Sequence, residues 1–86
     1  MDEKELYLLM GFVKISQKRE ITIKSIGKAV KMPSEIAREN NLKTSQVSAA
    51  LIDLKKKGLV FCVNEEARKG RLYKLSDAGL KILENI

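Results

Sequence analysis

The positively charged side chains of this 86-residue chain are concentrated in one part of it. Residues 43–74 hold eight lysines and arginines against three acidic residues, so this stretch carries +5 of the net charge of +6. Arg68, Lys69 and Arg71 are bunched around a single glycine. A solvated basic face is the simplest interpretation of a lysine run such as Lys55-Lys56-Lys57. The concentration as a whole favours a polyanion, and nucleic acid in particular, as the partner.

Residues that support other kinds of chemistry are scarce. The chain has no histidine, which removes the Ser-His-Asp triad, the usual general base and the commonest metal ligand. The single cysteine, Cys62, excludes an internal disulfide and a multi-cysteine zinc cluster. Paired acids, a nucleophile–base set and a phosphate-binding loop are also absent. We therefore expect a protein that is not an enzyme and that uses no metal and no cofactor.

The N-terminal stretch MDEKELYLLMGFVK carries little information about targeting. Its acidic lead makes a poor signal peptide, and its apolar run, Leu6 to Val13, is too short to span a bilayer. We expect a cytoplasmic protein without a membrane partner. A chain of this length fits one domain, 1–86, with a modest core.

Residues 1–15 are apolar in almost every direction, which predicts a helix over 3–15 that is covered on most sides. A buried strand is the alternative, because Gly11 disfavours a helix by about 1 kcal/mol. Either a second copy of the chain covers this helix, or the helix completes the core of its own domain. On the first interpretation the expected dimer interface consists of Leu6, Leu9, Met10, Val13 and Leu83.

Two helices with a short turn between them are predicted within residues 33–57. Pro33 suits the first turn of a helix over 33–40, which ends at Asn40-Asn41, because asparagine tolerates the left-handed conformation of a tight exit. Thr44 is a competent N-cap for a helix over 44–57, which Gly58 then ends. Its inward stripe is Val47, Ala50, Leu51 and Leu54. This spacing is typical of a helix-turn-helix, although an ordinary αα-hairpin would look the same.

The segments on either side complete the expected fold. A helix over 17–28, capped by Ser16, comes before, with Ile23 and Ile26 inward and Arg19 outward. After Gly58, residues 59–75 read as a β-hairpin with a glycine-containing turn and a basic tip. Alternation places Val60 and Cys62 on the face of Tyr73 and Leu75, so Cys62 is expected in the core. A last helix, 77–85, follows, with Leu80 and Leu83 inward.

The run PSEIARENNLKTSQVSAALIDLKKKGLV, followed by NEEARKGRLYKLS, resembles the archaeal winged-helix regulators related to the MarR and ArsR families. The resemblance implies a mostly α fold with a small β-hairpin (α+β), namely a winged helix-turn-helix of about five helices and a two-stranded wing. It also implies double-stranded DNA as the partner, a homodimer, and a role in transcription regulation. Ala49 stands where many relatives carry a basic side chain, which weakens the expectation of strong sequence specificity. Asn41 and Met32 replace a usual glycine and a frequent capping threonine.

The expected DNA contacts divide by element. Gln46 is the side chain able to bridge the N6 and N7 atoms of an adenine, and the second helix would lie in the major groove. The recognition-helix residues are Thr44, Ser45, Gln46, Ser48 and Ala49. The wing residues are Arg68, Lys69 and Arg71, and the backbone contacts are Ser34, Arg38, Lys43, Lys55 and Lys56. Two alternatives remain: a protein-interaction module, which outward-facing Ile52 would suit, and RNA or chromatin binding by charge alone.

Overall fold

The helices and strands follow the expected order along the chain. The computed structural model describes all 86 residues. Its elements are α1 (Glu3–Lys14), α2 (Gln17–Ile26), α3 (Pro33–Glu39), α4 (Thr44–Lys56), β1 (Val60–Cys62), β2 (Tyr73–Leu75) and α5 (Asp77–Asn85). The predicted fold class, five helices with one antiparallel hairpin, is confirmed, and the 3–15 segment is a helix rather than a strand. None of the helices has the length and apolar character needed to cross a membrane.

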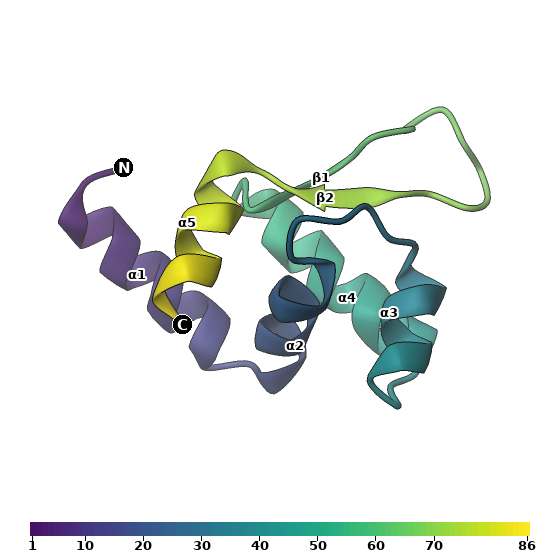
Figure 1. Ribbon diagram of the computed structural model, residues 1–86, viewed down its shortest axis with the longest axis horizontal. Coiled ribbons are helices and arrows are strands. Elements are labelled where there is room, and N and C mark those ends of the chain that lie inside the picture. Colours follow the sequence, from purple (N-terminus) through teal and green to yellow (C-terminus); the bar gives the residue numbers. More distant parts are fainter.

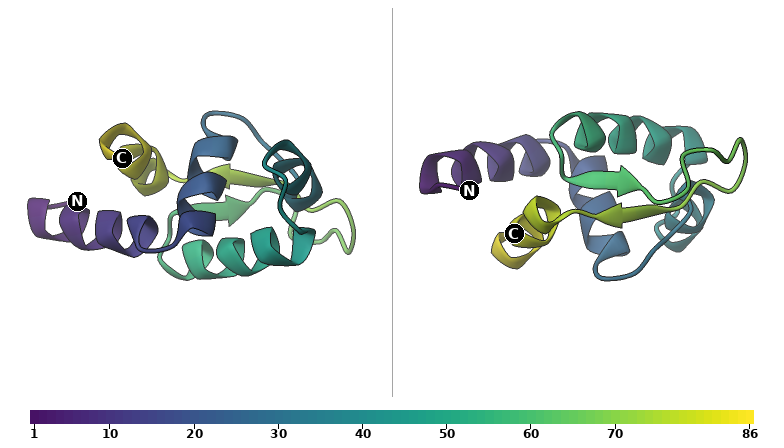
Figure 2. Two further views of the ribbon diagram at one scale, coloured as in Figure 1. Left: turned by 90° about the horizontal axis from the view of Figure 1, so that it is seen from below. Right: turned by 90° about the horizontal axis from the view of Figure 1, so that it is seen from above.

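The elements gather around α2 and α4, and different elements form the two ends of the molecule (Figure 1). At one end α1 and α5 lie side by side, with α1 projecting beyond the rest, as both views in Figure 2 show. At the other end the loop between β1 and β2 extends past α3 and the start of α4. The molecule measures 37 × 26 × 19 Å. Its long axis therefore separates the end formed by α1 and α5 from the end that carries the wing.

Side-chain caps explain where three of the helices begin. Asp2 accepts a hydrogen bond from the Glu5 N–H at 2.8 Å, and Ser16 accepts one from Arg19 at 3.3 Å. Ser76 caps α5 by accepting from Gly79 at 3.1 Å. Each oxygen satisfies one of the backbone donors that a helix leaves unpaired at its start.

The expected N-cap of α4 is wrong by one residue. Lys43 occupies the cap position, and Thr44 is already the first helical residue. Instead of a capping hydroxyl, the Gln46 side-chain oxygen accepts a hydrogen bond from the Lys43 N–H at 3.0 Å. Met32 caps α3 in the same manner, since its N–H donates to Glu35 at 2.8 Å. In both helices the third residue, rather than the cap residue, supplies the acceptor.

The turn between α3 and α4 has the predicted left-handed residue. Asn41 has a φ of +55°, and the Leu42 N–H then donates to the Ala37 carbonyl at 2.9 Å. This six-residue closure is a Schellman motif, which satisfies a carbonyl at the end of α3. The turn fixes how α3 and α4 cross, with the small Ala37 buried at 3% exposure. The helix-turn-helix interpretation is therefore correct in geometry.

The core lies where the apolar periodicity places it, with one exception. The whole predicted stripe of α4 is buried, as are Ile23, Ile26 and Cys62. In α5, however, Ile82 is fully buried, whereas Leu80 and Leu83 are only partly covered. The prediction of a helix at α5 is confirmed, but the face predicted to point inward is wrong. Gly79 lies against Leu59 and Leu75, and this contact turns Ile82 inward.

Two contacts were not expected from the sequence. Lys31 forms an isolated antiparallel bridge with Tyr73, through backbone hydrogen bonds of 3.0 and 2.8 Å, so the hairpin gains a one-residue third partner. Arg19, expected outward, is only 21% exposed in its side chain. It donates to the Phe12 carbonyl at 2.9 Å, pairs with Asp53 at 3.2 Å and stacks 4.0 Å from the Phe12 ring. Arg19 thereby joins α1, α2 and α4.

Helix α1 has two apolar faces with different environments. Leu6, Leu9 and Met10 are partly buried against their own core, and Val13 is fully buried in it. Val13 is therefore removed from the expected dimer interface, because no second chain can reach it. The opposite face is open: Tyr7, Leu8 and Ile15 are 62%, 65% and 84% exposed. The helix thus completes its own core on one side and leaves an apolar stripe on the other.

An ion pair next to the Lys31 bridge predicts a pH dependence of stability. Lys31 donates to Glu39 at 2.8 Å, and this hydrogen bond is the largest cause that lowers the pKa of Glu39 below its ordinary value of 4.5. A pKa lowered by folding contributes stability above the unfolded value, and this contribution disappears as the pH falls through the folded value. We expect Glu39→Gln to be less stable than the parent at pH 6. When the pH is lowered below 4.5, the free energy of unfolding should fall less in this variant than in the parent, because the variant has no Glu39 carboxylate to protonate.

Urea unfolding of parent and variant at several pH values between 6 and 3 measures this difference. Glu84→Gln is the matched control, since Glu84 is an exposed carboxylate without an ion-pair partner. Superimposable pH profiles for Glu39→Gln and the parent would contradict the role of the Lys31 pair.

Candidate nucleic-acid interface

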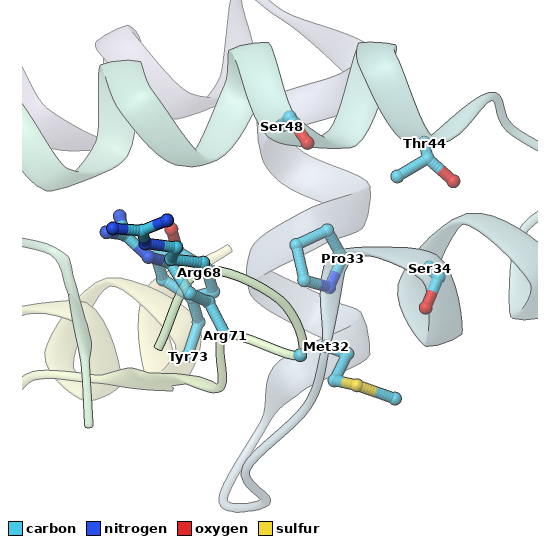
Figure 3. Close-up of a pocket in the computed structure, with 9 residues that line it drawn as sticks. Met32, Pro33, Ser34, Thr44, Ser48, Arg68, Arg71 and Tyr73 are labelled. Atoms are coloured by element: carbon cyan, nitrogen blue, oxygen red, sulfur yellow. The ribbon is translucent and has the colours of Figure 1, made fainter. Parts of the chain in front are cut away.

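A hollow lies between α3, the first half of α4 and the wing. It has a volume of about 310 Å³ and opens on the surface. In Figure 3 the Ser48 and Thr44 side chains approach it from α4, while Arg68 and Arg71 lie on its opposite side. Its lining residues are Met32, Pro33, Ser34, Thr44, Ser48, Arg68, Gly70, Arg71 and Tyr73. Five of the expected DNA-contacting residues, from three separate elements, therefore share one site.

The exposed part of α4 carries small polar side chains. Thr44, Ser45 and Ala49 are exposed, and Ser48 is half-buried at the edge of the hollow. Gln46 is half-buried and its side-chain oxygen is already engaged with the Lys43 N–H. Its amide N–H groups remain available as donors, but a bridge to adenine would require that oxygen too. The expected base-reading residue is therefore partly committed to starting its own helix.

The wing separates into residues that are free and residues that hold the loop. Arg68 and Lys69 are exposed, and neither makes an ion pair or a side-chain hydrogen bond within the chain. Arg71 instead folds back on the loop and donates to the carbonyls of Ala67 at 2.8 Å and Glu65 at 3.1 Å. Arg71 keeps its charge, but its guanidinium is already oriented by the protein.

The cations of the helix-turn-helix also differ in their availability. Lys55 pairs with Glu65 of the wing at 3.0 Å, and this hydrogen bond raises the pKa of Lys55 and lowers the pKa of Glu65. Lys43, Lys56 and Arg38 are exposed and have no acidic partner. Lys55 therefore ties α4 to the wing, while the other three remain free to meet an anion.

Two of the three acidic residues between residues 43 and 74 are neutralised by ion pairs. Asp53 is paired with Arg19 and Glu65 with Lys55, which leaves Glu66 as the unpaired carboxylate between residues 43 and 74. Unpaired cations consequently dominate the potential of this end of the molecule. Such a surface attracts polyanions and steers their approach, and the attraction weakens as salt is added.

Sequence reasoning missed several residues of the hollow. Tyr73 was assigned to the core face of the hairpin, and it does pack there, but it also lines the hollow with Met32 and Gly70. The Lys31 bridge to Tyr73 brings Met32 beside the wing. No short-range pattern indicates this proximity, because it depends on a single pairing between distant residues.

Comparison with known proteins shows the fold. FabT of Streptococcus pneumoniae, solved in complex with DNA, superposes with a TM-score of 0.66 at 24% sequence identity. The similarity covers 93% of this chain and 64% of the FabT chain, so the present chain spans less than two thirds of FabT's length. The shared architecture is the winged helix. No family model and no curated protein matches the sequence.

Proposed function

We propose that this chain binds double-stranded DNA, with α4 in the major groove and the wing on the backbone or the minor groove, as a transcriptional regulator. The observation that carries the proposal is the hollow, which Ser34, Thr44 and Ser48 line together with Arg68 and Arg71 of the wing. These groups come from two helices and a hairpin that the fold brings to one end. Hydroxyls and arginines are the groups that proteins use most often on DNA phosphates.

The dimensions of α4 fit this role. A major groove about 12 Å wide admits one helix, and small side chains let the helix backbone approach the base edges. Ser45 and Ala49 are exposed and short, so neither would hold α4 away from the groove. The Ser45 and Ser48 hydroxyls can each donate one hydrogen bond to a base or a phosphate. Gln46 can bind an adenine through both its oxygen and its amide N–H only if the oxygen releases the Lys43 N–H. We expect sequence preference to be modest and phosphate contacts to supply most of the affinity.

Fluorescence anisotropy with a labelled duplex, repeated over a salt series, tests the proposal. Five free cations (Arg38, Lys43, Lys56, Arg68 and Lys69) would give a slope of log K against log salt of about −4.5. Selection from a random duplex library then separates a regulator from a general DNA-binding protein. An enriched motif supports regulation, whereas binding without enrichment supports a packaging role.

A protein-docking role is the second candidate, and Ile52 is the observation that favours it. Ile52 is 57% exposed on α4, the helix that DNA would otherwise contact, and Ala49 on the same helix is also exposed. An exposed apolar residue on this surface could meet a thymine methyl group or a protein. Absence of binding to any duplex at low salt would favour the docking role.

We further propose that a second copy of the chain covers the free stripe of α1. Leu8, Gly11 and Ile15 follow one another at spacings of three and four, and Tyr7 lies beside them. Gly11 is open, since a Cβ there would meet nothing within 4 Å, so a partner helix can approach closely. Glu3 and Glu5 in the first turn and Lys14 in the last would face opposite charges in an antiparallel pair.

Leu8→Glu is expected to prevent dimerisation without unfolding the domain, because Leu8 is 65% exposed. The reason is that a charge in the centre of an apolar interface must be desolvated on association. Sedimentation equilibrium at micromolar concentration measures the change, with circular dichroism as the check on folding. Ile52→Glu, at an exposed position outside the stripe, is the matched control. A parent chain that sediments at 9.7 kDa would contradict the dimer.

A further inference from the structure

The wing loop is organised by the side chain of Asn64. Its Oδ1 accepts a hydrogen bond from the Leu72 N–H at 2.8 Å and another from the Cys62 Sγ at 3.4 Å. Its Nδ2 donates to the Gly70 carbonyl at 3.1 Å. One side chain on the outgoing arm of the loop therefore bonds two backbone groups on the returning arm.

Asn64 lies where the strand ladder stops. The paired strands contain three residue pairs, the last being Cys62 with Tyr73, and one more backbone bond joins Val63 to Leu72 at 2.9 Å. Beyond that point no further ladder bond joins the two arms. Past this position the side-chain amide of Asn64 links the two arms, through its hydrogen bonds to the Leu72 N–H and the Gly70 carbonyl.

A second set of bonds closes the tip beyond Asn64. The Ala67 N–H donates to the Asn64 carbonyl at 2.9 Å, and the Arg71 guanidinium binds the carbonyls of Ala67 and Glu65. Arg68 and Lys69 follow directly and carry free side chains on this closed loop. The hydrogen bonds of Asn64 and Arg71 thus fix the backbone of the loop that carries the two free cations.

The polar groups of Asn64 have little capacity left for a ligand. Its oxygen accepts two hydrogen bonds, which is the usual limit of an amide oxygen, and one of its two N–H groups is also used. The residue is half-buried. Its effect on a bound molecule must therefore pass through the loop that it shapes.

We propose that Asn64 is a positioning residue that holds the wing in its DNA-binding conformation before DNA arrives. The inference rests on the proposed DNA-binding function and specifies which residue makes the wing competent. A loop ordered on folding does not have to be ordered on binding, so the same cations bind more tightly. Without the Asn64 bonds, Arg68 and Lys69 would occupy many positions, and few of these would meet a phosphate.

The test is a double-mutant cycle on duplex affinity with Asn64→Ala and Arg68→Ala. Asn64→Ala is expected to weaken binding about fivefold to tenfold, a loss within the range of coupling energies between residues of one network. In the Asn64→Ala background, Arg68→Ala should then cost much less than it costs in the parent. Asn85→Ala is the matched control, because the Asn85 amide bonds only the Lys81 carbonyl of its own helix. Fold losses that multiply independently would overturn the inference.

Amide hydrogen exchange provides a readout that needs no DNA. The Leu72 N–H should exchange faster in Asn64→Ala, while amides of α2 and α4 remain protected. If the parent binds no duplex, the proposed function fails, yet this exchange measurement still decides whether Asn64 orders the wing. Arg71→Lys is the second variant, since it keeps the charge and loses the two-point bond to Ala67 and Glu65. Parent-like binding and exchange in both variants would overturn the proposal.

Discussion

Gly79→Ala is expected to destabilise the folded chain by about 3 kcal/mol, the upper end of the usual cost of overpacking a core. A Cβ at this position would fall on the Leu59 carbonyl oxygen and would also lie 3.1 Å from the Leu59 carbonyl carbon and 3.2 Å from the Leu75 Cβ. Two of these atoms are backbone, which cannot rotate away. Glycine is therefore required for α5 to approach the hairpin this closely.

The close approach at Gly79 has consequences for the whole hairpin. The Leu59 carbonyl accepts a hydrogen bond from the Ser76 N–H at 3.0 Å, and Ser76 in turn caps α5. Displacing α5 would break the contact that joins the start of β1 to the end of β2. We therefore expect Gly79→Ala to weaken the hydrogen bond that closes the hairpin next to α5, as well as the core contact.

Gly11→Ala is the matched control for Gly79→Ala. Gly11 also lies within a helix, but an added Cβ there meets nothing within 4 Å. Alanine is favoured over glycine within a helix by about 1 kcal/mol, so this variant should be at least as stable as the parent. Urea unfolding measures both substitutions, at a chain concentration low enough to keep the protein monomeric. Equal stability of Gly79→Ala and the parent would contradict the packing described for α5.

Replacing both Arg68 and Lys69 with alanine is expected to weaken duplex binding about tenfold to a hundredfold at physiological salt. Both side chains are exposed and free of internal partners, so their loss leaves the fold unchanged. Each lost phosphate contact lowers the magnitude of the slope of log K against log salt by about 0.9, so the slope should flatten by up to two units. A salt series by fluorescence anisotropy measures both quantities.

The double substitution of Lys4 and Lys81 with alanine controls for net charge. Both lysines are exposed on α1 and α5, at the end of the molecule away from the wing. This variant loses the same two charges, yet its slope should match that of the parent, because screening removes the influence of distant charges. An equal loss in both double variants would mean that binding depends on total charge rather than on the wing.

Local rules predicted the elements because each of them depends on neighbouring residues. The apolar stripe of α4, the left-handed Asn41 and the serine caps of α2 and α5 follow from periodicity and backbone chemistry within a few positions. The alternation of the hairpin likewise predicted the buried Cys62. These features predict the helices and strands of the fold without any knowledge of tertiary contacts.

The contacts that organise the site could not be predicted in this way. Lys55 was expected to contact the DNA backbone, but Glu65 on the outgoing arm of the wing pairs with it. Arg19 was expected outward, and it is instead drawn inward by Phe12 on the preceding helix and by Asp53, which lies far from it along the chain. Side-chain partners of this kind depend on how elements meet in three dimensions, which no local pattern encodes.

The resemblance in sequence supplied the arrangement that local rules left open. A helix-turn-helix and an αα-hairpin have the same periodicity. The β-hairpin expected directly after the second helix, together with the PSEIA, KKKGLV and RKGRLYKLS pieces, distinguished them. It did not indicate which cations of the wing are free. Arg71 binds the loop, whereas Arg68 and Lys69 do not, and only the structure separates these roles.

The most direct test of duplex binding by this surface is a titration of the isotope-labelled chain with duplex DNA, followed through its backbone amide resonances. If DNA binds this surface, the shifts will concentrate at Ser34, at Thr44 to Ala49 and at Arg68 to Arg71, with little change in α1 and α5. Shifts confined to α1 and α5, or no shifts at low salt and saturating duplex, would contradict it.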